Sequence, residues 1–278
     1  MTGSRTITLA LLALLTTGAV VFAQEDQKSS DQAAPQTQPV APEAKPADAM
    51  AETEAPADDP EVTKVVDLLL AKWNDHKSMS ADLNIDMVAD QGGRELVVKG
   101  TGRCEIQRTD DGEKVRFELI QNMKMGEGDS AMEMERKLIT TDNGKVVYTM
   151  VEQMGQKQVV KSVPGRQNIP KFGGEHMFEA LRAENKLALL PEDKVGDQEV
   201  YVIEATPKRP DPSMQITKSV LYFSKDSGAM LRMESFDPTG KKVQTITFDN
   251  VQMNLDLAAD RFEFEVPEGV QVIDQTGN

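Results

Sequence analysis

The sequence has very few of the residues that build common metal and covalent sites. Its 278 residues include one cysteine, Cys104, which excludes an intramolecular disulfide bond, and two histidines, which leave almost no conventional zinc site. Basic residues are also scarce: 31 Lys and Arg stand against 46 Asp and Glu, and the net charge of −15 argues against binding of nucleic acid. We therefore expect no metal, no cofactor and no nucleic-acid partner.

The first 23 residues have the pattern of a secretory signal peptide. Arg5 supplies a short positive region, and the apolar run 7–21 is too short for a membrane span. Residues 21–23 form a small-x-small cleavage site, so we expect cleavage after Ala23. Because no cysteine lies just past that point, we expect the exported product to be soluble; an uncleaved amino-terminal anchor is the alternative.

Residues 24–59 are expected to form a disordered tether. They consist mainly of Ala, Pro, Gln, Glu and Asp, which cannot bury enough apolar surface to offset the entropy lost on ordering. Nine acidic residues against Lys28 and Lys45 give this segment a net charge of −7. The tether could hold the following domain away from a surface or partner, or could serve only as a solubilising leader.

Residues 60–278 are enough for one domain with a sizeable core, and the domain is expected to open with a helix. Asp59 suits the N-cap and Pro60 the first helical position. The apolar residues that follow recur at helical spacing and should form one stripe: Val62, Val65, Val66, Leu69, Leu70 and Trp73.

After Met79 the hydrophobic period changes to two, and turn signals rich in Gly, Asp and Asn arrive about every ten residues. This pattern predicts antiparallel strands joined in a strongly curved sheet or barrel, a mainly β member of the α+β class. Eleven strands are predicted, at 81–89, 94–107, 113–124, 131–141, 145–151, 157–163, 199–206, 216–224, 229–236, 242–251 and 261–266.

The strand pattern is interrupted between Pro164 and Gly196. The segment Glu175–Leu190 has helical spacing, with apolar Met177, Phe178, Leu181, Leu187 and Leu190. A helix with aromatic and aliphatic residues placed among strands predicts a plug or lid over the sheet.

The apolar positions of the third and fourth predicted strands indicate how these two strands pair. Apolar residues occupy odd positions in the third strand, including Met123 and Met125, and even positions in the fourth, including Met132 and Met134. If the apolar positions share one face, Met125 should lie opposite Met132 and Met123 opposite Met134. Flexible, polarizable methionines on an inner surface could adapt to an irregular apolar ligand.

Two other interpretations of these methionines remain open. Thioethers are soft ligands that select Cu(I), which an exported protein could collect. Ordinary core packing is the simplest alternative, because Phe117, Leu119 and Leu138 on the same strands indicate an apolar wall.

Several segments, in this order, resemble the periplasmic lipoprotein carrier LolA and its lipoprotein-sorting family. They are the strand from Gly102 through Arg108, the segment Leu138-Ile139-Thr140-Thr141-Asp142-Asn143-Gly144-Lys145-Val146-Val147-Tyr148, Tyr201-Val202-Ile203-Glu204-Ala205-Thr206-Pro207, Asp249-Asn250, and the closing Phe262-Glu263-Phe264-Glu265-Val266-Pro267-Glu268-Gly269-Val270. The resemblance extends from about Pro60 to Asp274.

The resemblance implies an unclosed antiparallel barrel of eleven strands, with helices covering its open side over a cavity for acyl chains. A functional arginine of the family follows a glycine by six residues, a spacing that Gly102 and Arg108 match, although Thr109 replaces the family's proline. Arg108 is the candidate gating residue, with a solvated strand-end cation as the alternative. The residues expected to contact ligand are Arg108, Phe117, Leu119, Met123, Met125, Met132, Met134, Leu138, Tyr148, Met177, Phe178 and Leu181.

The resemblance favours a periplasmic, monomeric protein that holds acyl chains of a lipoprotein or phospholipid and carries them between membranes. A membrane-bound donor or acceptor protein could be a partner. The alternative is a sensor that binds lipid or lipoprotein and relays this to a protein partner. An enzyme is not expected, because nothing in the sequence pairs His76 or His176 with an activated serine.

Overall fold

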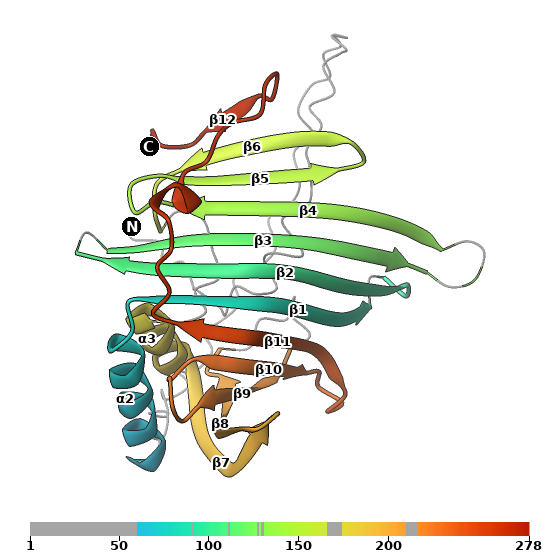
Figure 1. Ribbon diagram of the computed structural model, residues 1–278. Helices are drawn as coiled ribbons and strands as arrows, with labels where there is room; N and C mark the ends of the chain where they lie inside the picture. The colour runs from blue at the N-terminus through green and yellow to red at the C-terminus, as the bar shows by residue number, and fades with distance from the viewer. Residues whose placement is uncertain are drawn as a thin grey trace, which may run out of the picture.

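The computed structural model describes residues 60–277 apart from positions 91, 111, 127, 129–130, 166–173 and 210–215. The predicted signal peptide (1–23) and tether (24–59) lie outside the described residues. The described chain forms one large curved sheet with two helices on one of its faces (Figure 1). Its helices are α2 (Pro60–Asn74), α3 (Gly174–Glu184) and a short 3-10 helix at Ala259–Phe262. Its strands are β1 (Ser78–Asp90), β2 (Glu95–Thr109), β3 (Gly112–Met125), β4 (Met132–Asp142), β5 (Val147–Gln153), β6 (Gln156–Ser162), β7 (Asn185–Val195), β8 (Gln198–Pro207), β9 (Lys218–Ser224), β10 (Met230–Phe236), β11 (Lys242–Met253) and β12 (Val272–Asp274).

The strand order is β12-β6-β5-β4-β3-β2-β1-β11-β10-β9-β8-β7. Neighbouring strands run antiparallel except for β12, which lies parallel to β6. The pairing of β1 with β11 joins the two halves of the chain, while β7 and β12 remain at opposite edges. The sheet is therefore an unclosed barrel with helices on one face, and the predicted fold class is confirmed.

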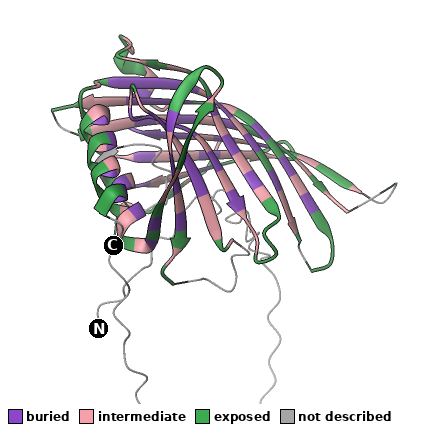
Figure 2. Ribbon diagram, turned by 90° about the horizontal axis from the view of Figure 1, so that it is seen from below, coloured by how far each residue is buried: buried purple, intermediate pink, exposed green. Residues whose placement is uncertain are grey.

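The curvature of the sheet agrees with irregularities in its ladders. Register shifts occur between β1 and β11 near Asp82 and between β9 and β10 near Arg232, and such bulges increase local twist and bend the strand. Buried positions recur along the strands, as Figure 2 shows. The face that carries α2 and α3 is called the inner face, and the opposite face the outer face.

Helix α2 forms where the amino-terminal stripe predicted it. Val62, Val66, Leu69 and Trp73 are buried in the main core together with inner-face residues of the sheet. One side of the helix is thus buried by the sheet, and exposed residues such as Leu68 lie on the other.

Helix α3 is shorter than predicted. It ends at Glu184, and Asn185–Val195 forms β7, so the predicted helix to Leu190 is wrong over its last six residues. The Asn185 side-chain amide donates to the Leu181 carbonyl, and the Lys208 amide donates to the Glu184 carbonyl, which satisfies groups at the helix end. From there Leu187 pairs with Ala205 of β8, so sheet pairing overrides the helical spacing.

The carboxyl-terminal segment also differs from the prediction. Residues 261–266 are not a strand: the 3-10 helix Ala259–Phe262 is followed by extended, unpaired chain. We call residues 254–274 the C-terminal strap. It crosses the sheet from the end of β11 toward β6, where the unpredicted β12 adds to the edge (Figure 1). Phe262, within the strap, is fully buried, which explains why the apolar pattern of this segment suggested a strand.

In the described part of the chain, no helix has the length and hydropathy needed to cross a membrane.

Candidate functional site

The inner face of β3 and β4 has the predicted register. Met125 pairs with Met132 and Met123 with Met134, as the alternation of apolar residues indicated. Further along the same strands, Leu119 pairs with Leu138 and Phe117 with Thr140. The candidate residues on these two strands therefore lie on one face, in two groups.

The first group lies beneath the helices. Phe117, Leu119 and Leu138 are each 1% exposed, and they belong to the same core as Phe178 and Leu181 of α3. The Phe178 ring lies 5.5 Å from the Phe223 ring of β9, measured between centroids. The aromatic and aliphatic side chains of α3 thus cover this part of the inner face, and the half-buried Met177 packs against the edge of the same core.

The second group lies toward the other end of the long strands. Met87, Leu96 and Val98 form a separate buried cluster, and half-buried Met123 and Met125 pack against it. Together with Met132 and Met134 this gives five methionines on three strands: Met87, Met123, Met125, Met132 and Met134, called here the methionine patch.

The methionine patch becomes more exposed toward its rim. Met87 is buried, Met134 is half-buried and accepts a contact from the Gln153 side-chain amide, and Met132 is 62% exposed. Met87 was missed in the sequence analysis, although its odd position after Leu83 and Ile85 in β1 places it on the inner face. The patch offers flexible apolar side chains that can reshape around a ligand.

A polar pair separates the two apolar groups. Gln121 of β3 is fully buried and lies directly opposite Arg136 of β4, which is 4% exposed. Burial lowers the pKa of the Arg136 guanidinium. Neither residue was singled out from the sequence, but both occupy inner-face positions in otherwise apolar series, between Leu119 and Met123 and between Met134 and Leu138.

Arg108 lies at the helix-covered end of the inner face. Its Nη1 donates to the Asn74 carbonyl at 2.9 Å and to the His76 carbonyl at 3.3 Å. Because the last carbonyls of a helix carry partial negative charge and lack partners, this guanidinium caps α2. Arg108 also borders a narrow apolar crevice of about 10 Å³ beside Trp73.

Tyr148 is separated from the other candidate residues. It pairs with Thr141 and lies on the outer face, where its ring stacks on Phe264 of the C-terminal strap at a centroid distance of 5.2 Å. Strand parity places Val147, not Tyr148, on the inner face. Tyr148, which was expected to contact ligand, therefore lies apart from the candidates on the inner face, and in this structure its ring packs against the strap.

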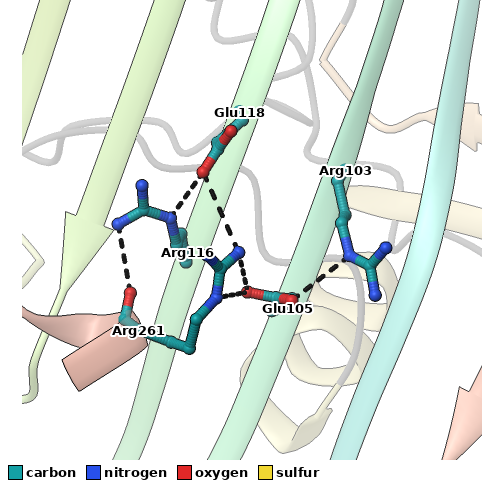
Figure 3. A network of polar contacts seen from close by, with 5 residues as sticks. All are labelled: Arg103, Glu105, Arg116, Glu118 and Arg261. Carbon is teal, nitrogen blue, oxygen red and sulfur yellow. Dashed lines mark hydrogen bonds and ion pairs between the residues drawn. The ribbon is translucent and has the colours of Figure 1, made fainter. Parts of the chain in front are cut away.

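A charged network fastens the C-terminal strap to the outer face (Figure 3). Arg261 of the strap donates to Glu105 Oε2 from Nε at 3.0 Å and from Nη2 at 2.8 Å, and Arg103 contacts the other oxygen of the same carboxylate at 3.2 Å. Arg116 bonds Glu118 at 2.6 Å and the Arg261 carbonyl at 3.1 Å. Because Glu105 is almost fully buried, two guanidinium partners offset the unfavourable burial of its charge.

The outer face also has an open hollow of about 550 Å³ over β1–β4 and β11. Asp82, Arg103, Glu118 and Lys137 are among its lining residues, and these charges make it a poor surface for a hydrocarbon chain. The apolar surface of the sheet lies on the inner face.

Two kinds of reactive group, metal-ligand clusters and the cysteine thiol, can be assessed among the described residues. Among them, no group of three or more His, Cys, Asp and Glu residues is arranged to hold a metal ion. Cys104 is fully buried, and burial together with the nearby Glu105 charge raises the pKa of its thiol to about 12, which leaves it protonated at neutral pH. It is a small buried side chain of the core.

Two comparisons with known sequences found partial matches. A family described as "Uncharacterized protein" matches residues 160–263. An outer-membrane lipoprotein carrier protein of Chromohalobacter salexigens is 39% identical over 89 residues, which cover 31% of this chain and 38% of that protein. The match thus spans well under half the length of this curated relative.

Several solved structures resemble the fold only distantly. An uncharacterized conserved protein from Thermus thermophilus is 11% identical, with a TM-score of 0.42 over 77% of this chain and 99% of the other. LprF from Mycobacterium bovis is 10% identical, with a TM-score of 0.40 over 73% and 97%. MucB is 15% identical, with a TM-score of 0.42 over 74% and 64%.

The open sheet with its covering helices is the architecture that the motifs from Gly102 to Val270 implied. The chain is similar to LolA-type outer-membrane lipoprotein carriers, and the resemblance that these motifs indicated is confirmed.

Proposed function

We propose that this protein is a periplasmic, non-enzymatic carrier that holds the acyl chains of a lipoprotein or phospholipid on its inner face. The observation that carries the proposal is the position of α3. Its Phe178 and Leu181 are each 1% exposed and belong to the main apolar core on the inner face. In the proposed mechanism, these side chains fill the place that an acyl chain takes when α3 moves aside.

The energetics permit this exchange. Burying one methylene contributes about 0.8 kcal/mol, so about fifteen methylenes contribute roughly 12 kcal/mol before the cost of association. Uncovering Phe178 and Leu181 costs roughly 1.5–3 kcal/mol for each side chain. A chain of ordinary length can therefore displace both, whereas a short chain cannot.

The polar contacts that hold α3 against α2 and the segment after β8 are weak enough to open. Arg182 of α3 donates to the Thr63 carbonyl and pairs with Asp67, whose side chain is 62% exposed. Lys208 Nζ donates to the Arg182 carbonyl at 2.7 Å. Solvent-exposed ion pairs contribute about 0–1 kcal/mol, so the buried Phe178 and Leu181 supply most of the closing free energy.

Arg108 takes a supporting part in the proposal. Its two hydrogen bonds to the end of α2 keep that helix on the sheet while α3 moves. In the proposed carrier, Arg108 limits how far the helical cover opens and so retains the ligand.

The lid is tested with two aspartates placed on opposite sides of α3. Phe178→Asp puts a charge against the apolar inner face, whereas Ala183→Asp puts the same charge at an exposed position of the same helix. After incubation with vesicles of dioleoylphosphatidylglycerol, native mass spectrometry counts the bound lipid. We expect Phe178→Asp to lose lipid and Ala183→Asp to keep it, with circular dichroism near that of the unchanged protein.

A third variant tests whether misfolding, and not the introduced charge, explains a loss of lipid from Phe178→Asp. Phe178→Ala shortens the side chain that fills the site and leaves the face apolar, so it should bind at least as much lipid as the unchanged protein. Absence of lipid from both the unchanged protein and Phe178→Ala would contradict the proposed function.

Transfer separates a carrier from a sensor. The proposed carrier should speed movement of a diacylated lipopeptide from donor to acceptor vesicles in proportion to its concentration. Lipid-dependent recovery of one stoichiometric membrane protein without any such transfer would instead favour the sensor.

A further inference from the structure

Gln121 is unusual because its amide is buried without partners. It has no solvent exposure, and neither Nε2 nor Oε1 has a hydrogen-bond partner among the described residues. Native proteins leave few buried polar atoms unpaired, because each such group loses its hydration without gaining a replacement. An apolar residue of similar size would fit this position at no such loss.

The neighbours of Gln121 in the sheet do not supply a partner. On β2 it lies opposite Gly100, which has no side chain, and a Cβ added to that glycine would lie 3.6 Å from Gln121 Cγ. Along its own strand, Leu119 and Met123 flank it on the same face. The amide is thus surrounded by apolar groups on three sides.

The fourth side carries Arg136. This buried guanidinium lies opposite Gln121 on β4, so the inner face carries a cationic side chain and a side-chain amide at a single level of the sheet. The buried core under α3 borders this level on one side, and the methionine patch borders it on the other. A ligand that spans the level would need a polar group within an otherwise apolar chain.

We propose that Gln121, beside Arg136, forms the subsite that binds the carbonyl of an acyl ligand. This inference rests on the proposed function and names the ligand class more closely: an acyl chain joined through an ester or amide, not a plain hydrocarbon. Nε2 of Gln121 donates to the acyl carbonyl oxygen, and the hydrocarbon extends along the apolar inner face. An amide linkage can come from an acylated peptide and an ester from a glycerolipid.

The test compares three ligands with equal chains. Hexadecane, methyl palmitate and N-methylpalmitamide each compete with the apolar fluorophore diphenylhexatriene for the unchanged protein. We expect the two carbonyl compounds to compete about tenfold better than hexadecane, as one hydrogen bond to a buried amide predicts. Whichever of the two competes better identifies the ester or the amide as the preferred source.

The variant Gln121→Leu replaces the amide by an apolar side chain of similar size. We expect it to remove the preference for carbonyl ligands and, at the same time, to raise the unfolding temperature, because it removes an unpaired buried amide. Thr141→Val is the matched control, since Thr141 has a buried hydroxyl on the outer face that finds no partner in the described part of the chain. The control should leave the ranking of ligands unchanged.

The outcomes separate this inference from the proposed function. Equal competition by all three ligands, or a carbonyl preference that survives in Gln121→Leu, overturns the subsite and leaves acyl binding in place. Failure of all three ligands to bind the unchanged protein overturns both.

Discussion

At the scale of single residues, two glycines show how closely the backbone segments of this protein approach one another. A Cβ on Gly102 of β2 would lie 2.0 Å from the Glu118 carbonyl oxygen of β3. Gly228, in the turn between β9 and β10, has a φ of +72°, and a Cβ there would lie 2.5 Å from the Leu69 carbonyl oxygen of α2. Both sites lack room for a side chain, and Gly228 also needs a backbone conformation that favours glycine.

Gly102→Ala should destabilise the protein by about 3 kcal/mol, because the backbone of β3 must shift to admit the methyl group. Gly100→Ala is the matched control on the same strand and face. Its closest contacts would be Leu119 Cδ1 at 3.2 Å and Ile85 Cβ at 3.3 Å, so a shift of only a few tenths of an ångström would admit the methyl group. Urea unfolding of both variants measures the difference; equal losses would show that the approach of Glu118 is not the cause.

The sequence predicted one part of the site and missed another for a common reason. Strict alternation located the pairs Met125–Met132 and Met123–Met134, because one buried face fixes the register. The same alternation contains Gln121 and Arg136, but a search for apolar residues passes over polar ones. Tyr148 was predicted as a ligand contact because it belongs to a motif of the family, but the alternation of β5 places its side chain on the outer face.

At the scale of elements, local spacing predicted the strands well and the segments between them less well. The runs over β1–β6 and β8–β11 were all found, because alternation and glycine turns mark them. The start of β7 was read as helix because Leu187 and Leu190 also fit helical spacing, and its pairing with β8 is a non-local contact. Residues 261–266 of the C-terminal strap alternate between apolar and polar side chains like a strand, yet they form no backbone pairing with the sheet.

The end of α3 should make stability depend on pH. Glu184 Oε2 is buried with no hydrogen-bond partner among the described residues, and burial raises the pKa of this carboxyl to about 7. In the unfolded chain the carboxyl loses its proton near its ordinary pKa, so the folded state binds more protons between the two values. Its stabilising contribution is fully present below the ordinary pKa and is lost as pH rises through about 7.

Replacing Glu184 by glutamine removes the titrating group and keeps a neutral side chain of similar shape. The unfolding temperature of the unchanged protein should therefore fall more steeply than that of Glu184→Gln as pH rises from about 5 to about 8. Differential scanning fluorimetry across this range gives both slopes. Parallel slopes would show that the Glu184 carboxyl does not titrate in this window.

At the scale of the whole molecule, the two faces of the sheet carry different kinds of side chain. The outer face carries charged residues and is clamped by the C-terminal strap through Arg261 and Glu105. The inner face carries the core beneath α3, the Gln121–Arg136 pair and the methionine patch. In the proposed carrier, the inner face receives an amphiphile, and the strap holds the sheet in shape while α3 moves.

The central claim, that the inner face holds an acyl chain, is tested most directly by native mass spectrometry. The mature protein is purified from an exporting host, and any bound molecules are extracted and identified. We predict near-stoichiometric phospholipid or acylated peptide, whereas a bound copper ion would show in the same spectrum and favour a thioether site at the methionine patch. A mass without ligand, unchanged after incubation with phospholipid and diacylated lipopeptide, would contradict the claim.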